Sequence, residues 1–438
     1  MTSPASPSKQ SKEQTRQTTF DIPVTDSPAA IDRVLHAHDG ILRCAPAWVP
    51  RAFCTPGRRL RLHPDDYYPF AKGRGGIDER WIASSIRADN GPETGPYEGL
   101  TLVVDQGDGQ ASDTALVPFD QIIAYGGAAV IGDRLWAAFG AWTTYSKFFD
   151  NYLPLPFHVH ASDDKAALVG KAGKPEAYYY PPQMNNFLAE QPISFLGLRP
   201  GVTREQVAEY LSRHHEGGDN RITDISYGYR TQLGQGWDVP AGVLHAPASV
   251  CTYEPQAASD VLSMFESWSN NMEVPADLLW KDVPQDHHGD LDFLVGLLDW
   301  ETNTDVNFRH NRALIPYETA ASQEAGGSDW IEKWIVFKSP HFSAKELTVN
   351  PGCSVTLTEQ DAYGAIAVQG HGSIGVAGSS TSQELAAITM VRINELTRDE
   401  YFVTAQAAQR GVTITNNSDA EPLVVLKNYG PGNVELGL

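Results

Sequence analysis

The chain has 438 residues, 41% of them hydrophobic, and its 33 Lys and Arg against 54 Asp and Glu give a net charge of −21. This charge repels phosphate backbones and anionic lipid headgroups, so the composition argues against nucleic acid or a membrane surface as a partner. The length predicts two domains, or one large core with insertions, and the apolar fraction excludes disorder throughout.

Residues 1–19 are polar and rich in Ser, Pro, Lys and Gln, without the apolar run of an export signal, so we expect a disordered tail. The sequence has no run of eighteen apolar residues that would predict a membrane span. Its cysteines are widely spaced and form no C-x-x-C pair, which favours a reducing compartment over a disulfide framework. We therefore expect a cytoplasmic protein. The cysteines are Cys44, Cys54, Cys251 and Cys353.

Beyond the tail, a short helix is expected where Ile31, Val34 and Leu35 recur at helical spacing. Most of the remaining sequence consists of brief β-runs separated by Gly, Pro, Asn and Asp. Such spacing favours a jelly roll or barrel over a parallel α/β sheet. The clearest expected strands are residues 100–104, 363–369, 388–393, 412–415 and 423–427.

The stretch PLPFHVHASDD contains His158 and His160 two residues apart. On a strand, positions i and i+2 face the same side, so both imidazoles can reach one ion. Glu176 follows after a Gly- and Lys-rich turn, at the head of an aromatic, strand-like run. His245 follows a turn in VPAGVLHA. Three imidazoles and one carboxylate suit zinc, iron, manganese, cobalt or nickel, and the ligand types alone do not choose among these metals.

Two helices are expected to interrupt the β pattern. Thr203 and Gln206 form a capping box before an apolar stripe, which predicts a helix over residues 203–215. Apolar spacing predicts a second helix over about 288–299.

Residues 318–329 lack periodicity and are interpreted as a linker. The linker divides a metal-binding domain, residues 20–317, from a second β-domain, residues 330–438. The second domain offers His341 and His371 without an H-x-H pair, so we expect it to lack a metal.

These motifs resemble the cupin superfamily and, within it, type I mannose-6-phosphate isomerases. The resemblance covers most of residues 67–268 and, more weakly, 330–438. It implies a mainly β fold of two cupin (jelly-roll β-barrel) domains with a few inserted helices, and one divalent metal, zinc in the first place. The matched positions are Trp81 in a Glu-x-Trp motif, Ser84 after that motif, Lys147 before the metal motif, Lys174 and Glu176 in GKPE, and His245. His158 replaces the family's glutamine.

The activity implied is aldose–ketose isomerisation, in which a proton moves between C1 and C2 through an enediol. Such a reaction needs an electrophile, which the metal supplies, and groups that carry protons. Lys174 and Glu254 are the candidates for proton transfer. Lys147 would contact a substrate hydroxyl or phosphate, and Trp81 would pack on a sugar face.

One departure concerns the substrate, because Met264 stands where the family places an arginine after the Ser-Asp motif. A sugar phosphate needs basic partners, so a free sugar and a phosphorylated sugar both remain candidates. Two alternatives also stay open: an iron(II) cupin dioxygenase, and a sugar-binding or regulatory cupin without turnover. The sequence does not decide between a monomer and a homo-oligomer.

Overall fold

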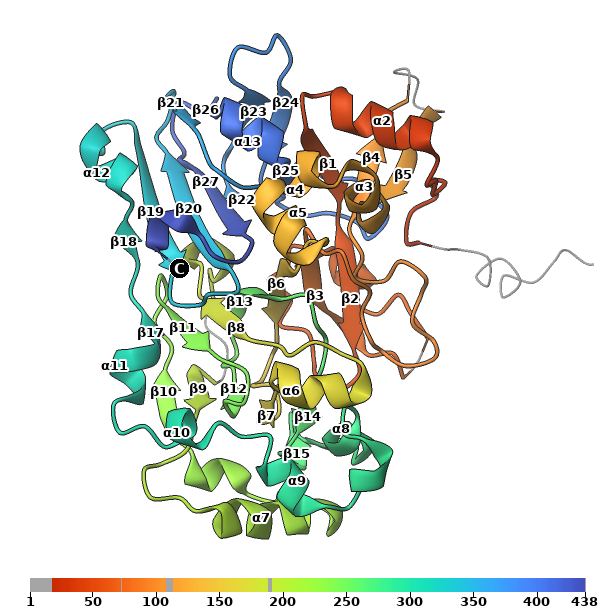
Figure 1. The fold of residues 1–438 in the computed structure, drawn as a ribbon, viewed down its shortest axis with the longest axis vertical. Coiled ribbons are helices and arrows are strands. Elements are labelled where there is room, and N and C mark those ends of the chain that lie inside the picture. The colour runs from red at the N-terminus through yellow and green to blue at the C-terminus, as the bar shows by residue number, and fades with distance from the viewer. Residues whose placement is uncertain (1–17, 72, 108–112, 188–190, 438) are drawn as a thin grey trace, which may run out of the picture.

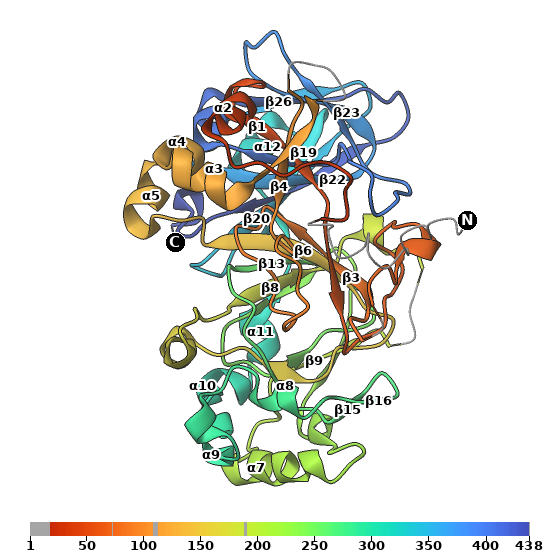
Figure 2. The same cartoon turned by 90° about the vertical axis from the view of Figure 1, so that its right-hand side faces the viewer.

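The computed structural model describes residues 18–71, 73–107, 113–187 and 191–437. Nearly all of the tail expected over residues 1–19 lies outside these ranges. The described chain is mainly β, as expected, and its sheets follow one another along the long axis of the molecule (Figures 1 and 2). None of its helices combines the length and the apolar character that a bilayer crossing requires.

Two of the sheets form what we call sandwich A. They pack on each other through apolar residues such as Phe149, Tyr178 and Leu196. The seven-stranded sheet has the order β17 (Ala313–Leu314), β11 (Gly236–Val239), β8 (Glu176–Tyr179), β13 (Cys251–Ala257), β6 (Thr144–Asp150), β3 (Gly76–Ile82), β2 (Ala47–Arg51). The five-stranded sheet has the order β10 (Gly228–Arg230), β9 (Ile193–Leu196), β12 (His245–Ala246), β7 (His158–Val159), β14 (Ser263–Met264).

Two further sheets form sandwich B, with a core that includes Leu347, Val425 and Ile414. The nine-stranded sheet has the order β18 (Tyr317–Glu318), β19 (Trp330–Val336), β20 (Ser343–Val349), β27 (Leu423–Tyr429), β22 (Tyr363–Gln369), β25 (Glu400–Val403), β1 (Ile41–Ala45), β4 (Leu102–Asp105), β5 (Ala115–Pro118). The four-stranded sheet has the order β21 (Ser354–Leu357), β26 (Val412–Asn416), β23 (His371–Val376), β24 (Gln383–Ala386). A separate two-stranded sheet, outside both sandwiches, consists of β15 (Trp268–Ser269) and β16 (Met272–Glu273).

The two sandwiches share one apolar core, in which Phe148 and Tyr253 of the seven-stranded sheet join Ile366 and Leu426 of the nine-stranded sheet. On the far side of sandwich A, Val159 and Leu244 pack against a layer of helices. Figure 2 shows this layer at the bottom, below the sheets. Its helices are α7 (Arg204–Ser212), α8 (Asp277–Trp280), α9 (Leu291–Val295) and α10 (Trp300–Asn303).

Several expected elements are confirmed. The early helix is α2 (Pro28–His36), and the Thr203 capping box starts α7, which continues as a 3-10 turn through His215. The second expected helix is shorter than residues 288–299, because α9 spans only Leu291–Val295. Helices that the sequence reading missed are α3 (Phe119–Gly126), α4 (Ala128–Ile131), α5 (Asp133–Phe139), α6 (Asp163–Ala166), α8, α10, α11 (Phe308–Arg312), α12 (Ala320–Ala325) and α13 (Ala405–Arg410).

The strand expected over residues 388–393 is wrong. Only Val391 forms an isolated bridge there, with Leu62. Asp66 holds the segment in another conformation, because its carboxylate accepts hydrogen bonds from the Arg392 guanidinium and from the Ile393 amide. Ile388, Val391 and Ile393 pack on the core without forming a continuous ladder, whereas Met390 is exposed.

A cut at residues 318–329 does not separate the two sandwiches. Strand β1, near the start of the chain, pairs with β25, so β1, β4 and β5 extend the sheet of sandwich B. The expected linker itself begins on β18 and contains helix α12, capped by Thr319. Its lack of periodicity reflects a short helix whose side chains are mostly exposed.

Candidate active site

Four residues in the interior of sandwich A form a cluster that we call the histidine centre: His158, His160, His245 and Glu176. The two short strands β7 and β12 are antiparallel neighbours, with His158 directly opposite His245. Residues that face each other across two strands project from the same side of the sheet. One donor atom from each of the three histidines lies within 4.8 Å of the others. The H-x-H pair and the distant His245 therefore converge, as the sequence predicted.

Backbone carbonyls fix the protonation of all three imidazoles. The Nδ1 atom lies 2.6 Å from the Pro156 carbonyl oxygen in His158, and 2.8 Å from the Val243 carbonyl oxygen in His245. In His160 the carbonyl of Val261 lies 2.6 Å from Nδ1. Because a carbonyl only accepts, Nδ1 is the donor in each ring, and in a neutral ring this leaves the lone pair on Nε2. This is the arrangement that supports histidine ligands of a metal.

Burial keeps the imidazoles of His158 and His160 neutral. It lowers the pKa of His158 well below the ordinary value, assisted by the neighbouring imidazoles. Burial and the nearby Lys174 ammonium lower the pKa of His160 to about 3. Neutral imidazole is the form that binds a metal.

Glu176 reaches the histidines from the opposite sheet, where it begins β8. Its Oε2 lies 3.0 Å from His160 Nε2, and its Oε1 lies 3.1 Å from His245 Nε2. The Tyr178 hydroxyl donates a hydrogen bond of 2.5 Å to Oε1. Burial opposes ionisation, yet Lys174 and the histidines hold the pKa of Glu176 well below its usual range. Glu176 therefore supplies a carboxylate.

The two candidate proton carriers also lie at the centre. The Lys174 ammonium is 2.7 Å from Glu176 Oε2, 2.9 Å from His160 Nε2 and 3.5 Å from Glu254 Oε1. Burial, and the charge of Glu176, raise the pKa of Glu254 to about 8. The structure thus brings Lys174 and Glu254 into contact with the predicted ligands.

Lys147 and Trp81 follow in the same row across the seven-stranded sheet, where Lys147 is opposite both Glu254 and Trp81. The Lys147 ammonium lies 3.2 Å from Glu254 and 3.2 Å from Glu79. Trp81 is fully buried, stacks on Tyr145 and donates to Glu79. Its contact with a sugar stays a prediction, because the ring is linked to the histidine centre indirectly. The indole donates to Glu79, and Glu79 in turn accepts from Lys147.

The sequence reading missed the acidic and basic residues that continue this row. Glu79 accepts from Arg51, whose guanidinium also pairs with Asp260 at 2.9 Å. Burial opposes the charge, but Asp260 and Glu79 raise the pKa of Arg51 well above its usual value. Glu79 belongs to the Glu-x-Trp motif that drew attention to Trp81, so that motif could have identified it. Nothing in the local sequence pairs Arg51 with Asp260.

The residues present fit a divalent metal. His245 Nε2 is buried and has no hydrogen-bond partner among the described residues, and it faces the same space as the other ring nitrogens. Three neutral nitrogens and a carboxylate form a donor set suited to zinc and related ions. The Lys174 ammonium against His160 and Glu176 shows that the cluster accommodates positive charge.

Met264 lies on β14, directly opposite His158, and is buried. It therefore shares a face of the sheet with the histidine, and brings an apolar thioether to the edge of the centre. An arginine here would place a cation beside the ligands.

The protein is therefore a mainly β protein whose packed sheets enclose a buried cluster of three histidines and a carboxylate. No protein-family model and no curated protein matches the sequence. Among solved structures, the chain is similar to mannose 6-phosphate isomerase from Bacillus subtilis, with a TM-score of 0.58 at 14% identity over 89% of this chain and 99% of that one.

Similar values hold for a mutant of phosphomannose isomerase from Salmonella typhimurium, with a TM-score of 0.59 at 11% identity, over 90% of this chain and 100% of that one. A zinc-bound mannose 6-phosphate isomerase matches over the same shares, with a TM-score of 0.59 at 10% identity. The similarity to these isomerases suggested by the sequence motifs is therefore confirmed for the fold.

Proposed function

We propose that the protein is a metal-dependent aldose–ketose isomerase acting on a sugar. The observation that carries the proposal is the meeting of three neutral imidazoles, a carboxylate and two candidate proton carriers in one buried cluster. The similarity in fold to mannose 6-phosphate isomerases, one of them zinc-bound, supports the same reaction class.

The histidine centre would hold the metal through His158, His160, His245 and Glu176. A bound divalent ion would polarise the carbonyl and hydroxyl oxygens of the sugar. Lys174 and Glu254, placed beside these ligands, would carry the proton that leaves C2 and is returned to C1, and the hydroxyl proton that passes from O2 to O1, so that aldose and ketose contain the same atoms and electrons. Tyr178 would orient the Glu176 carboxylate by its hydrogen bond.

The substrate could be a free aldose or a phosphorylated aldose, and the two place different demands on the charges of the site. Lys147 and Lys174 already face Glu79, Glu254 and Glu176, and Met264 adds no charge. A phosphate group would therefore compete with carboxylates for these ammonium groups. A free aldose needs no such cation, so mannose and mannose 6-phosphate should be compared directly.

The experiment incubates the full chain, loaded in turn with Zn²⁺, Mn²⁺ or Co²⁺, with each sugar in deuterated water. We expect ketose to form with deuterium incorporated from solvent, and Glu254→Gln to lower kcat by about 10²–10⁴-fold. The exposed carboxylate of Glu301 provides a matched control, Glu301→Gln, which should leave the rate unchanged.

Other outcomes would replace the proposal. Oxygen uptake that requires iron, without ketose formation, would identify a dioxygenase. Saturable binding of a sugar without exchange of its C2 proton would identify a binding protein.

A further inference from the structure

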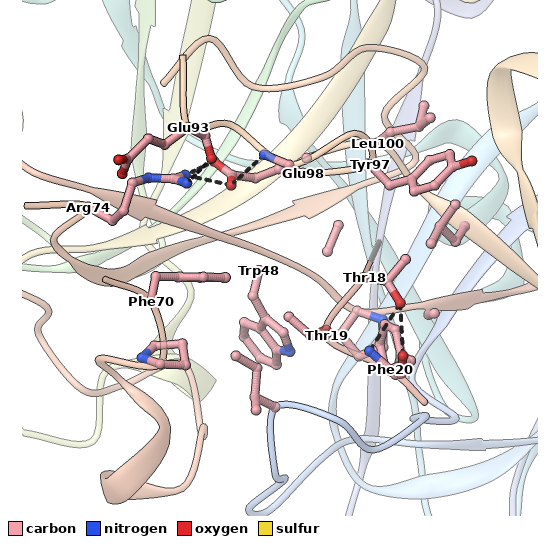
Figure 3. Close-up of a pocket in the computed structure, with 18 of the residues that line it drawn as sticks. Thr18, Thr19, Phe20, Trp48, Phe70, Arg74, Glu93, Tyr97, Glu98 and Leu100 are labelled. Atoms are coloured by element: carbon pink, nitrogen blue, oxygen red, sulfur yellow. Dashed lines mark hydrogen bonds and ion pairs between the residues drawn. The ribbon is translucent and has the colours of Figure 1, made fainter. Parts of the chain in front are cut away.

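A pocket of about 570 Å³ lies apart from the histidine centre, beside the segment that connects β1 to β2. Figure 3 shows Trp48 in its middle, between Phe70 on one side and Thr19 and Phe20 on the other, with Arg74 and Tyr97 above. The volume falls in the range of small-molecule sites, about 300–1,000 Å³. None of the four residues of the histidine centre lines it.

The indole of Trp48 supplies an unused hydrogen-bond donor. Trp48 is only 3% exposed, and its Nε1 has no hydrogen-bond partner among the described residues. In Figure 3 the ring nitrogen lies on the side of Thr19 and Phe20, which also line the pocket. A buried donor without a partner is costly, so a ligand that offers an oxygen here would satisfy it.

The charged residues of the pocket disfavour an anion. Arg74 is the only cation among the described lining residues, and its guanidinium is bound to both oxygens of Glu98, at 2.7 and 2.6 Å. The Asn90 amide also donates to Glu98. The exposed Glu93 adds a second carboxylate to the lining. A phosphorylated or carboxylated ligand would meet these acids without a free cation.

A neutral saccharide matches this combination. Its hydroxyl groups both accept, as Trp48 Nε1–H requires, and donate, as the carboxylates of Glu93 and Glu98 require. Its C–H faces pack on aromatic rings, of which the lining provides Phe20, Trp48, Phe70 and Tyr97. We propose that this pocket is a second site, which binds a neutral saccharide independently of the histidine centre.

Two variants of lining residues test the site in the full chain. Trp48→Phe keeps an aromatic ring and removes the donor. Gly95 lines the pocket, and a Cβ there would meet only Glu98 Cβ, at 3.9 Å, so Gly95→Leu fills the space without strain. Trp268→Phe, at a half-exposed tryptophan outside the pocket, is the matched control.

The probes are methyl α-mannopyranoside, maltose and cellobiose, with glucose 6-phosphate as the anionic counterpart, titrated by calorimetry. We expect at least one neutral probe to saturate at one site per chain, with affinity reduced about tenfold or more in Trp48→Phe and in Gly95→Leu. Trp268→Phe and His245→Ala should retain it. Thermal melts of each variant establish that it is folded.

Absence of saturable binding by every neutral probe would overturn the site. The site would also be overturned if both pocket variants bound the probe as tightly as the native chain does, or if the phosphorylated probe bound more tightly than the neutral ones. Loss of binding in His245→Ala would assign the sugar to the histidine centre instead.

Discussion

Each sandwich buries a cluster of charged and polar side chains, and the two clusters differ in how they balance charge. In sandwich B, Glu332, Lys345, Glu359 and Lys427 form what we call the ion-pair quartet. Lys345 lies 3.0 Å from Glu359, and Lys427 lies 2.8 Å from Glu359 and pairs also with Glu332. Two buried ammonium groups thus face two buried carboxylates, and the charges of these four groups balance without an added ion. The partly exposed carboxylate of Glu435 also lies 3.1 Å from Lys345.

The histidine centre of sandwich A is built differently. Its lysines are matched by Glu79, Glu176 and Glu254. The Lys174 ammonium also contacts His160 Nε2, and His245 Nε2 has no hydrogen-bond partner among the described residues. A cluster whose donors are already paired stabilises the fold, whereas one that turns lone pairs inward is suited to bind a cation. The same kind of β-scaffold can therefore serve structure in one half and chemistry in the other.

The largest expected effect comes from removing one ligand of the histidine centre. His245→Ala should reduce the bound metal from one equivalent to near zero and lower isomerase activity by more than about 100-fold. Metal analysis by mass spectrometry after dialysis checks the stoichiometry. His371→Ala, at an exposed histidine of sandwich B, should change neither quantity. Full metal content in His245→Ala would refute the ligand assignment.

Breaking the quartet should affect stability instead. Lys427 is 1% exposed, so Lys427→Met leaves two buried carboxylates facing a single lysine, and should cost about 3–5 kcal/mol in the free energy of unfolding. Urea denaturation measures this loss of unfolding free energy. Lys333→Met, on the other face of β19, is the control.

A double variant of the quartet separates the effect of charge balance from the effect of side-chain packing. Lys427→Met combined with Glu359→Gln restores charge balance and should recover part of the lost stability. If the double variant is less stable than the single one, charge balance is not what the quartet provides.

Acid should weaken the quartet over a defined range of pH. Burial opposes ionisation of Glu359, but Lys427 and Lys345 lower its pKa to about 2. Because the pKa is depressed from 4.5, this contribution is present above about pH 4.5 and is lost as the pH falls towards 2. It amounts to roughly 3 kcal/mol at most.

The measurement compares unfolding free energies of the native chain and Glu359→Gln between pH 7 and pH 2. The difference should shrink as the pH falls. A difference that stays constant would show that Glu359 is not ionised in the folded protein.

The sequence located the histidine centre well because its signals are local. The H-x-H pair, the GKPE turn and the VPAG turn each mark a strand, and every predicted ligand lies in the cluster. The period of two along a strand was enough to predict that His158 and His160 converge.

Long-range pairing could not be predicted in the same way. The joining of Ile41–Ala45 to Glu400–Val403 depends on sheet edges that no short window contains. The quartet draws Glu332 and Lys345 from β19 and β20, Glu359 from the segment between β21 and β22, and Lys427 from the distant β27. Each lysine or glutamate alone resembles a solvated side chain. The pairing of Arg51 with Asp260 could not be predicted either, because the two residues are far apart in the sequence.

Each cluster contains a tyrosine that donates a hydrogen bond to a carboxylate, and we expect the smallest effects on stability and metal affinity from removing these hydroxyl groups. Tyr178 donates to Glu176 at 2.5 Å in the histidine centre, and Tyr429 donates to Glu359 at 2.7 Å in the quartet. Each loss, in Tyr178→Phe or Tyr429→Phe, should lower stability by about 1–2 kcal/mol. Only Tyr178→Phe should weaken metal binding, by about tenfold, because its hydroxyl orients a ligand. Competition with a chromophoric chelator measures that affinity; an equal loss in Tyr429→Phe would mean that the two clusters do not differ in function.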